Sequence, residues 1–312
     1  MVKMIVIKLT NVTKKYDNKT VIDDLSFEIE ENSICGFLGP NGAGKTTTFK
    51  LLNGLINSNS GTIEILGKFI NSKNPSRDIK FLQDVPEFYN YMTSYEYLKF
   101  ICQLNNLDNI DNRIKETLEL VGLQSVTKKR VGKFSRGMKQ RIGIASNIIS
   151  NPKILLLDEP VSALDPIGRK EIFDLLSKLK GKMTILFSTH IIDDIERVSD
   201  KIIIINNGKK LMDGTISEVK NKFLTNMIEL EFMNEKDMKK FSDAFNATDI
   251  EINSVEADSI RPQKNSLKFK VDNMPEFQNN IFKILTKEKI NINKFNVVTP
   301  TLEEIFMKEV AE

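Results

Sequence analysis

Apolar residues along this chain fall into short runs separated by polar residues, glycine and proline. Most runs have the length of a strand, and the stretch Val21–Glu30 alternates, with Leu25, Phe27 and Ile29 on one face. We expect strands at residues 6–12, 21–30, 33–38, 62–66, 79–82, 154–157, 183–188, 202–205 and 210–212. Helical spacing recurs between them, at residues 47–52, 94–123, 166–179 and before 149. This alternation of strands and helices predicts an α/β fold.

The helical pattern between Ser94 and about Leu123 interrupts the strands. Its apolar residues fall on two stripes: Tyr97, Leu98, Ile101 and Leu104 on one, and Ile114, Leu118 and Val121 on the other. A helical insert inside a framework of strands, loops and helices predicts a subdomain, at about residues 84–135.

A glycine-rich loop lies between the expected strand 33–38 and the expected helix 47–52. It fits the pattern G-x-x-x-x-G-K-[ST] and consists of Gly39, Pro40, Asn41, Gly42, Ala43, Gly44, Lys45, Thr46 and Thr47. The glycines let backbone N–H groups approach phosphates, the helix N-terminus adds partial positive charge, and Lys45 adds a full charge. A chance glycine-rich turn is the alternative, but the flanking strand and helix favour a site for a nucleoside triphosphate.

Two acids follow the buried strand 154–157. In an open parallel sheet, ligands bind at the carboxyl ends of strands, so Asp158 is placed to reach Mg²⁺ beside the hydroxyl of Thr46. Glu159 is then placed to orient or deprotonate a water molecule. Two solvated turn residues are the alternative interpretation.

Two further residues are candidates for nucleotide contacts. His190, the single histidine of the chain, ends the strand at 183–188 and could contact a γ-phosphate, although a lone histidine is more often structural. Tyr16 lies beside a predicted turn and could stack on a base, or could be a surface aromatic.

Composition narrows the class of protein. The chain has 312 residues, 40% of them hydrophobic and 28% charged, with a formal net charge of +3. These values are ordinary for a globular protein, and the small charge argues against a dedicated nucleic-acid binder but not against a membrane-facing surface. No run approaches the ~18–20 apolar residues that span a bilayer, and no signal peptide is recognisable, so we expect a cytosolic chain. The two cysteines, Cys35 and Cys102, have no metal-binding or redox spacing.

The tail, residues 222–312, carries no chemical motif. Its pattern predicts strands at 227–232, around 250–255, at 268–271 and at 293–298, with helices at 236–245 and 275–286. The order β-α-β-β-α-β predicts a small α+β domain with a ferredoxin-like arrangement. A helix-cap signature begins at Thr301, and no aromatic-basic motif of an RNA-binding sheet is evident.

Together these residues resemble the ATP-binding subunit of ABC transporters over about residues 4–220, because five separated motifs occur in the family's order. The resemblance places Walker A at Gly39–Thr47, Walker B at Ile154–Asp158 and the catalytic acid at Glu159. The remaining positions are the Q-loop Gln83 (also a Mg²⁺ contact), the signature Phe134–Met138, the D-loop Ser162–Asp165 and the switch His190. It also implies that Tyr16 stacks on adenine, and that Asp165 lies at the nucleotide.

The signature departs from the family's usual Leu-Ser-Gly-Gly-Gln. Ser135 and Gly137 are kept, and the resemblance implies that they contact the γ-phosphate of a partner subunit. Arg136 replaces a glycine and adds a charge there, which puts the rate of turnover in question. A site that binds but does not hydrolyse ATP is the alternative, against which Glu159 argues.

The resemblance implies a P-loop ATPase domain at 1–221 and an accessory domain at 222–312. It further implies ATP and Mg²⁺, a dimer around two ATP molecules, and a separate transmembrane permease contacted through residues 84–89. The cap at Thr301–Met307 is similar to the C-terminal helix of ATPases serving drug, bacitracin or lantibiotic exporters. We therefore expect an exporter subunit on the inner face of the membrane. The alternatives are a soluble ABC ATPase acting on ribosomes or DNA, and a tail that serves regulation or dimerisation.

Overall fold

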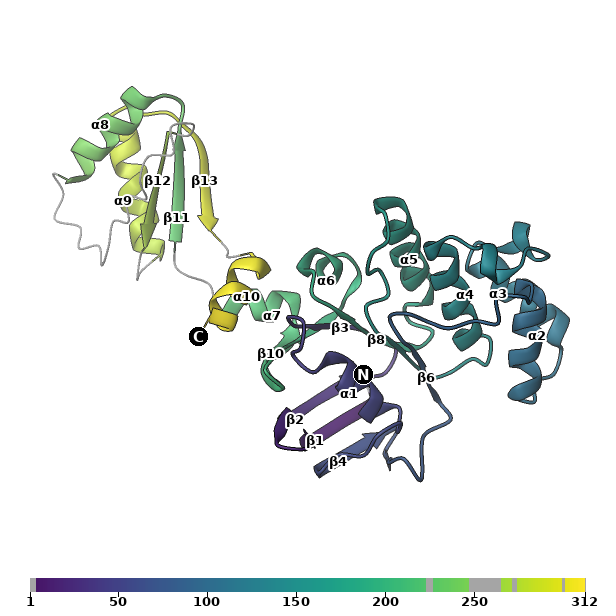
Figure 1. Ribbon diagram of the computed structural model, residues 1–312. Helices are drawn as coiled ribbons and strands as arrows, with labels where there is room; N and C mark the ends of the chain where they lie inside the picture. Colours follow the sequence, from purple (N-terminus) through teal and green to yellow (C-terminus); the bar gives the residue numbers. More distant parts are fainter. Residues whose placement is uncertain (1–3, 223–226, 247–264, 271–273, 299–300, 312) are drawn as a thin grey trace. The chain divides into compact units, whose positions relative to one another are not determined.

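The computed structural model describes residues 4–222, 227–246, 265–270, 274–298 and 301–311. It divides into two compact units, residues 1–216 and 217–312 (Figure 1). The first unit contains two sheets and the helices around them. The second contains one smaller sheet with its own helices.

A six-stranded sheet is the centre of the first unit, in the order β10-β9-β3-β8-β7-β6. Neighbouring strands are parallel except for the edge pair β9 and β10. The strands are β3 (Ile34–Leu38), β6 (Ile79–Leu82), β7 (Ile154–Leu157), β8 (Thr184–Thr189), β9 (Lys201–Asn206) and β10 (Lys209–Thr215). Every residue of β3, β7 and β8 is buried, as expected for parallel strands covered on both faces.

A second, antiparallel sheet of the same unit has the order β2-β1-β4-β5. Its strands are β1 (Ile5–Tyr16), β2 (Lys19–Glu30), β4 (Ser60–Ile65) and β5 (Lys68–Phe69). The predicted face of Leu25, Phe27 and Ile29 is buried, and it belongs to one apolar cluster with Phe37 of β3. Phe27 and Phe37 lie 5.8 Å apart between ring centroids, so the two sheets share a core.

The helices of the first unit include the predicted insert. They are α1 (Lys45–Leu52), α2 (Ser94–Leu104), α3 (Ile110–Leu120), α4 (Arg136–Ile148), α5 (Pro166–Leu179) and α6 (Ile192–Val198), with α7 (Ile216–Lys222) at the boundary between units. Short 3₁₀ turns, η1 (Gln124–Val126) and η2 (Val131–Lys133), precede α4. Figure 1 shows α2 and α3 beside α4 at the edge of this unit.

One expectation about the insert is wrong. Leu104 does not belong to a buried stripe, because its side chain is 63% exposed. Tyr97 and Leu98 of the predicted stripe are buried, together with Ser94 and Cys102, whereas Leu104 is the last residue of the helix. The second stripe is buried as predicted, at Ile114, Leu118 and Val121.

The second unit has a three-stranded antiparallel sheet in the order β12-β11-β13. Its elements are β11 (Met227–Phe232), α8 (Glu235–Asn246), β12 (Ser266–Lys270), α9 (Met274–Lys287), β13 (Ile292–Val298) and α10 (Leu302–Ala311). The sheet and helices α8 and α9 share a phenylalanine-rich core: Phe232, Phe241, Phe245, Phe269 and Phe277. The strand expected around 250–255 lies outside the described residues. Thr301 and Glu304 exchange the two hydrogen bonds of a capping box at α10.

Candidate nucleotide site

The candidate residues follow four neighbouring strands of the central sheet. The glycine loop follows β3, His190 follows β8, Asp158 and Glu159 follow β7, and Gln83 follows β6. The pairing of Leu38 with Thr189 and of Leu82 with Leu157 brings the carboxyl ends of these strands to one edge. This edge is where an open parallel sheet binds its ligands.

The glycine loop turns tightly before α1 begins at Lys45. Gly44 has a φ of 104° and lies so close to β2 that an added Cβ would be 2.5 Å from Cδ1 of Ile22. An added Cβ at Gly39 would be 2.6 Å from the carbonyl oxygen of Ile205. Only glycine fits at these two positions. The absence of side chains there lets the loop turn closely enough for its backbone N–H groups to face a bound phosphate. The rest of the loop consists of Pro40, exposed Asn41 and Gly42, and buried Ala43.

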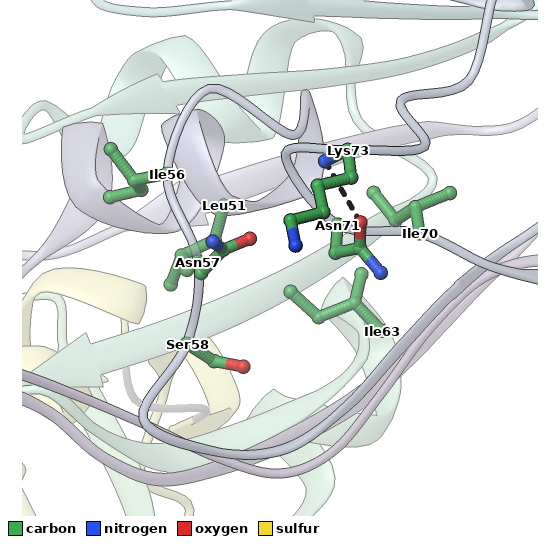
Figure 2. Close-up of a pocket in the computed structure, with 8 residues that line it drawn as sticks. All are labelled: Leu51, Ile56, Asn57, Ser58, Ile63, Ile70, Asn71 and Lys73. Atoms are coloured by element: carbon green, nitrogen blue, oxygen red, sulfur yellow. Dashed lines mark hydrogen bonds between the residues drawn. The ribbon is translucent and has the colours of Figure 1, made fainter.

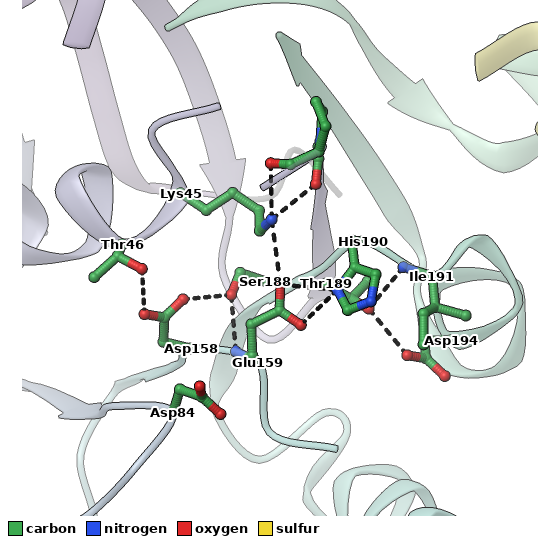
Figure 3. Close-up of polar contacts among 12 residues, drawn as sticks. Lys45, Thr46, Asp84, Asp158, Glu159, Ser188, Thr189, His190, Ile191 and Asp194 are labelled. Carbon is green, nitrogen blue, oxygen red and sulfur yellow. Dashed lines mark hydrogen bonds and ion pairs between the residues drawn. The ribbon is translucent and has the colours of Figure 1, made fainter. Parts of the chain in front are cut away.

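The ammonium of Lys45 is buried at the centre of the site, with the residue 6% exposed. Its Nζ donates to the carbonyl oxygens of Gly39 at 2.7 Å and Pro40 at 3.2 Å. The same atom lies 3.2 Å from Oε1 of Glu159 (Figure 3). These contacts fix a positive charge where the loop and the acid pair meet.

Thr46 and Asp158 are joined directly across the site. The Thr46 hydroxyl, on the exposed start of α1 beside half-buried Thr47, donates to Oδ2 of Asp158 at 2.6 Å. Asp158 is 3% exposed, and its other oxygen accepts from the Ser188 hydroxyl at 2.6 Å. A carboxylate oxygen and a hydroxyl, both hard donors, therefore lie together at the edge of the sheet.

Glu159 lies between Lys45 and His190. Its Oε2 is 3.0 Å from Nδ1 of His190, and its backbone has a φ of 47° in the left-handed region. The backbone N–H of Glu159 donates to the Ser188 hydroxyl at 2.9 Å, which holds that unusual conformation. Figure 3 shows the acid, the lysine and the histidine pointing toward one another.

Ser188 is a site residue that the sequence interpretation missed. Its hydroxyl donates to Asp158 and accepts from the N–H of Glu159, so one buried group positions both acids. Ser188 is 0% exposed. The available signal was a serine directly after the apolar run Ile185–Phe187, at the end of a predicted strand.

Comparison with known proteins places this geometry in a family. A model of the ABC transporter family matches residues 22–162, and a model of the DrrA1-3-like ATP-binding protein C-terminal domain matches residues 214–310. The bacitracin transport ATP-binding protein BcrA of Bacillus licheniformis is 38% identical over 97% of this chain and 96% of its own length.

The chain belongs to the ATP-binding subunits of ABC transporters.

Two other comparisons agree with this assignment. The lantibiotic transport ATP-binding protein SrtF of Streptococcus pyogenes is 35% identical over 66% of this chain and 90% of its own length. A solved ATP-binding subunit of an ABC transporter is 27% identical with a TM-score of 0.63, covering 70% of this chain and 93% of that one. The expected ABC ATPase fold is therefore confirmed, as are ATP binding and the assignment of the chain as an ATPase.

Several residues that the ABC resemblance indicates lie apart from the cluster around Lys45. Gln83 is exposed, and its Nε2 donates to the carbonyl oxygen of Val85 rather than to Thr46 or Asp158. Tyr16 ends β1, is 44% exposed and has the Lys14 ammonium 4.9 Å from its ring centroid. Asp165 caps α5, accepting from Gly168 N–H at 2.8 Å. All three side chains therefore make local contacts in this structure.

The signature residues begin α4. Ser135 caps the helix by accepting from the N–H of Met138 at 3.3 Å, and Gly137 lies in its first turn. In the part of the chain that the structure describes, no hydrogen bond or ion pair joins either residue to the glycine loop. Arg136, the departure from the family's signature, is half exposed and lies 3.9 Å from Asp84, the residue after Gln83.

A separate hollow of about 290 Å³ lies beside the antiparallel sheet (Figure 2). Its floor is apolar, formed by Leu51, Ile56, Ile63 and Ile70. Of the polar residues that line it, Asn71 serves the local turn, because its Oδ1 accepts from the N–H groups of Lys73 and Asn74. This hollow contains none of the residues of the nucleotide site.

No helix in the described ranges is both long and apolar enough to cross a membrane.

Proposed function

We propose that this chain is the ATP-hydrolysing subunit of an ABC exporter, and that two copies bind two ATP molecules and drive a separate transmembrane permease. In this proposal residues 1–221 form the ATPase domain, with a helical subdomain at about 84–135, and residues 222–312 form an accessory domain. The chain then works at the inner face of the cell membrane, held there by its permease.

The position of Glu159 carries the proposal. The carboxylate lies 3.2 Å from the Lys45 ammonium and 3.0 Å from the His190 ring, on the edge where the glycine loop ends. A phosphate bound in that loop would compete with Glu159 for the charge of Lys45. The carboxylate would then be free to orient or deprotonate a water molecule, with His190 beside it as the γ-phosphate contact.

The chemistry of the neighbouring oxygens fits Mg²⁺. Thr46 Oγ1 and Asp158 Oδ2 are 2.6 Å apart, and Mg²⁺ prefers one or two protein oxygens together with phosphate oxygens and water. In the proposal Thr46 and Asp158 hold the ion, and Gln83 joins them by turning away from Val85. When bound, Mg²⁺ would neutralise charge on the phosphates of ATP.

The location of the signature residues supports a dimer. Ser135 and Gly137 lie at the start of α4, without a hydrogen bond to the glycine loop of the described chain. A hydroxyl at a helix N-terminus is suited to contact an anion. In the proposed dimer, that anion is a phosphate of the ATP bound to the second subunit. Asp165, at the start of α5, and Tyr16, at the end of β1, complete the proposed nucleotide contacts.

An exposed apolar segment after Gln83 supports docking of a permease. Val85 and Tyr91 are each 66% exposed and Tyr89 is 48% exposed. The ring of Tyr89 packs against Tyr91 at 6.0 Å and against Phe100 of α2 at 5.6 Å. Helix α2 thus packs, through Phe100, against an aromatic surface formed by Tyr89 and Tyr91, as expected for a preformed binding surface.

The names of the relatives suggest the cargo. BcrA is described as a bacitracin transport protein and SrtF as a lantibiotic transport protein. We therefore propose export of a drug, a peptide antibiotic or a lipid-like compound.

The test is a pull-down of the tagged chain from detergent-solubilised membranes of its source organism, followed by mass spectrometry. The proposal expects a stoichiometric polytopic membrane protein, whose loss on mutation of the aromatic surface would link it to residues 85–91. Ribosomal or DNA-repair proteins in its place would overturn the exporter and leave the ATPase standing.

A further inference from the structure

Helix α6 carries a buried carboxylate that the nucleotide site does not use. Asp194 is 2% exposed, in the first turn of α6. Its Oδ1 lies 2.5 Å from the Arg169 guanidinium, and its Oδ2 accepts from the Thr189 hydroxyl at 3.0 Å. A buried carboxylate needs such partners, and both of its oxygens have one.

Each partner of Asp194 belongs to a segment that the nucleotide site uses. Arg169 lies on α5, four residues after its cap Asp165, and its backbone N–H donates to the Asp165 carbonyl oxygen at 2.9 Å. Thr189 immediately precedes His190. Asp194 therefore connects the start of α5 with the residue before the switch histidine.

Thr189 constrains the backbone around His190 on two sides. Its hydroxyl accepts from the N–H of Ile191 at 3.0 Å, so it spans His190 while donating to Asp194 (Figure 3). Its carbonyl oxygen accepts from the N–H of Gly39, the first residue of the glycine loop, at 3.3 Å. Any displacement of Asp194 would thus reach the backbone on both sides of His190.

The start of α6 is packed closely on the central sheet. Ile195, next to Asp194, is 0% exposed and packs on β3, where an added Cβ at Gly36 would be 2.1 Å from its Cδ1. Helix α6 also contacts α5 through the Arg197 guanidinium, 5.3 Å from the ring centroid of Phe173. The Arg169–Asp194 ion pair therefore joins α5 to the start of α6, and the hydrogen bond from Thr189 joins that carboxylate to the end of β8.

We propose that Arg169, Asp194 and Thr189 are positioning residues that couple the segment Ser162–Asp165 to the orientation of His190. The inference rests on the proposed role of His190 at the γ-phosphate. A partner subunit that shifts the start of α5 would move Arg169, and Asp194 and Thr189 would carry that shift to the switch histidine.

The test combines Thr189→Val and Asp194→Asn with His190→Ala in the full chain, measuring the kcat and KM of ATP hydrolysis. Both substitutions preserve shape and remove one hydrogen-bonding or charged group. The expected result is a fall of about tenfold in kcat, with KM within a factor of about two, since the loss is one of positioning. In the His190→Ala background the same substitutions should cause no further loss, because they act through the missing ring.

Asp193→Asn and Lys170→Met are matched controls, since both residues are exposed neighbours of the tested ones. Arg169→Lys should restore part of the loss caused by Arg169→Met, and circular dichroism should show each variant folded. Equal losses with and without His190, or an unchanged kcat in folded variants, would overturn the inference. Failure of the proposed function is a different result, namely full-rate hydrolysis in Glu159→Gln or His190→Ala.

Discussion

Oε2 of Glu159 lies 3.0 Å from Nδ1 of His190, although 31 residues separate them in the chain. The contact joins the end of β7 to the end of β8, which are neighbours in the sheet. Since Lys45 contacts the other oxygen of the same carboxylate, the acid has a charged partner on one side and a titratable one on the other. This arrangement predicts that Glu159 is the group whose loss stops hydrolysis while leaving ATP bound.

Glu159→Gln should lower kcat for ATP by about 100-fold or more, the usual contribution of a general base, while ATP affinity changes little. The neutral amide cannot accept the proton of water, so ATP-bound dimers should accumulate. Phosphate release and light scattering with ATP measure the two effects. Glu116→Gln, on the exposed side of α3, is the control; hydrolysis at the normal rate in Glu159→Gln would show that another residue is the base.

Asp158→Asn should raise the Mg²⁺ concentration needed for half-maximal hydrolysis. Changes to outer-shell partners of a metal typically weaken its binding by ~10–100-fold, and removing a direct oxygen ligand should weaken Mg²⁺ binding at least as much. A Mg²⁺ titration of ATPase activity provides the measurement, and removal of Mg²⁺ with EDTA should stop the unmodified chain. Asp174→Asn on the exposed face of α5 is the matched control. An unaltered Mg²⁺ requirement in Asp158→Asn would show that other residues hold the ion.

Ser188→Ala should destabilise the fold and slow hydrolysis together. It leaves Oδ1 of Asp158 and the N–H of Glu159 without their shared partner, which costs about 1–3 kcal/mol for buried groups. We expect kcat to fall about tenfold, because both acids lose their positioning. Urea unfolding and steady-state kinetics test this. Ser177→Ala, at an exposed position of α5, should leave both quantities within error.

The thiol of Cys35 should be unreactive in the folded chain. Cys35 lies in β3 with 1% exposure, and burial raises its pKa above the ordinary value of 9.0. Only the unfolded chain then loses this proton above about pH 9, so the free energy of unfolding should fall as pH rises, by at most about 1.4 kcal/mol per pH unit from this group. The difference in this slope between the unmodified chain and Cys35→Ala measures the effect. Rapid labelling by a disulfide reagent without denaturant would contradict the prediction.

Tyr91→Asp should uncouple the chain from its permease without affecting its intrinsic ATPase rate. The side chain is 66% exposed on the aromatic surface, and a buried charge at an interface centre is strongly unfavourable. Co-purification with the permease and ATPase assays of the isolated chain separate the two effects. Phe69→Asp, at a similarly exposed aromatic of β5 (62%), is the control. Retained permease in Tyr91→Asp would place the docking surface elsewhere.

Much of the site could be predicted because many of its residues are adjacent in the sequence. The loop Gly39–Thr47 joins a strand to a helix, and this local context sufficed to predict a phosphate site. The helix 166–179 was predicted with the bounds of α5, since the capping carboxylate of Asp165 and Pro166 at the first position fix its start locally. Periodicity also identified the buried faces of β2 and α3.

The tertiary structure decided which side chains meet. Ser188 positions both acids only because β7 and β8 are neighbours in the sheet and paired in register. The local sequence does not determine the order of strands in the sheet. Asp194 is the same type of residue as its exposed neighbour Asp193, yet it is buried because α6 directs it toward Arg169 and Thr189. Leu104 fits an apolar stripe but is exposed, since periodicity indicates a face and not where its packing partners end. Sequence thus determined the local chemistry of the phosphate loop and acids, whereas sheet order and helix packing determined the long-range contacts that orient them.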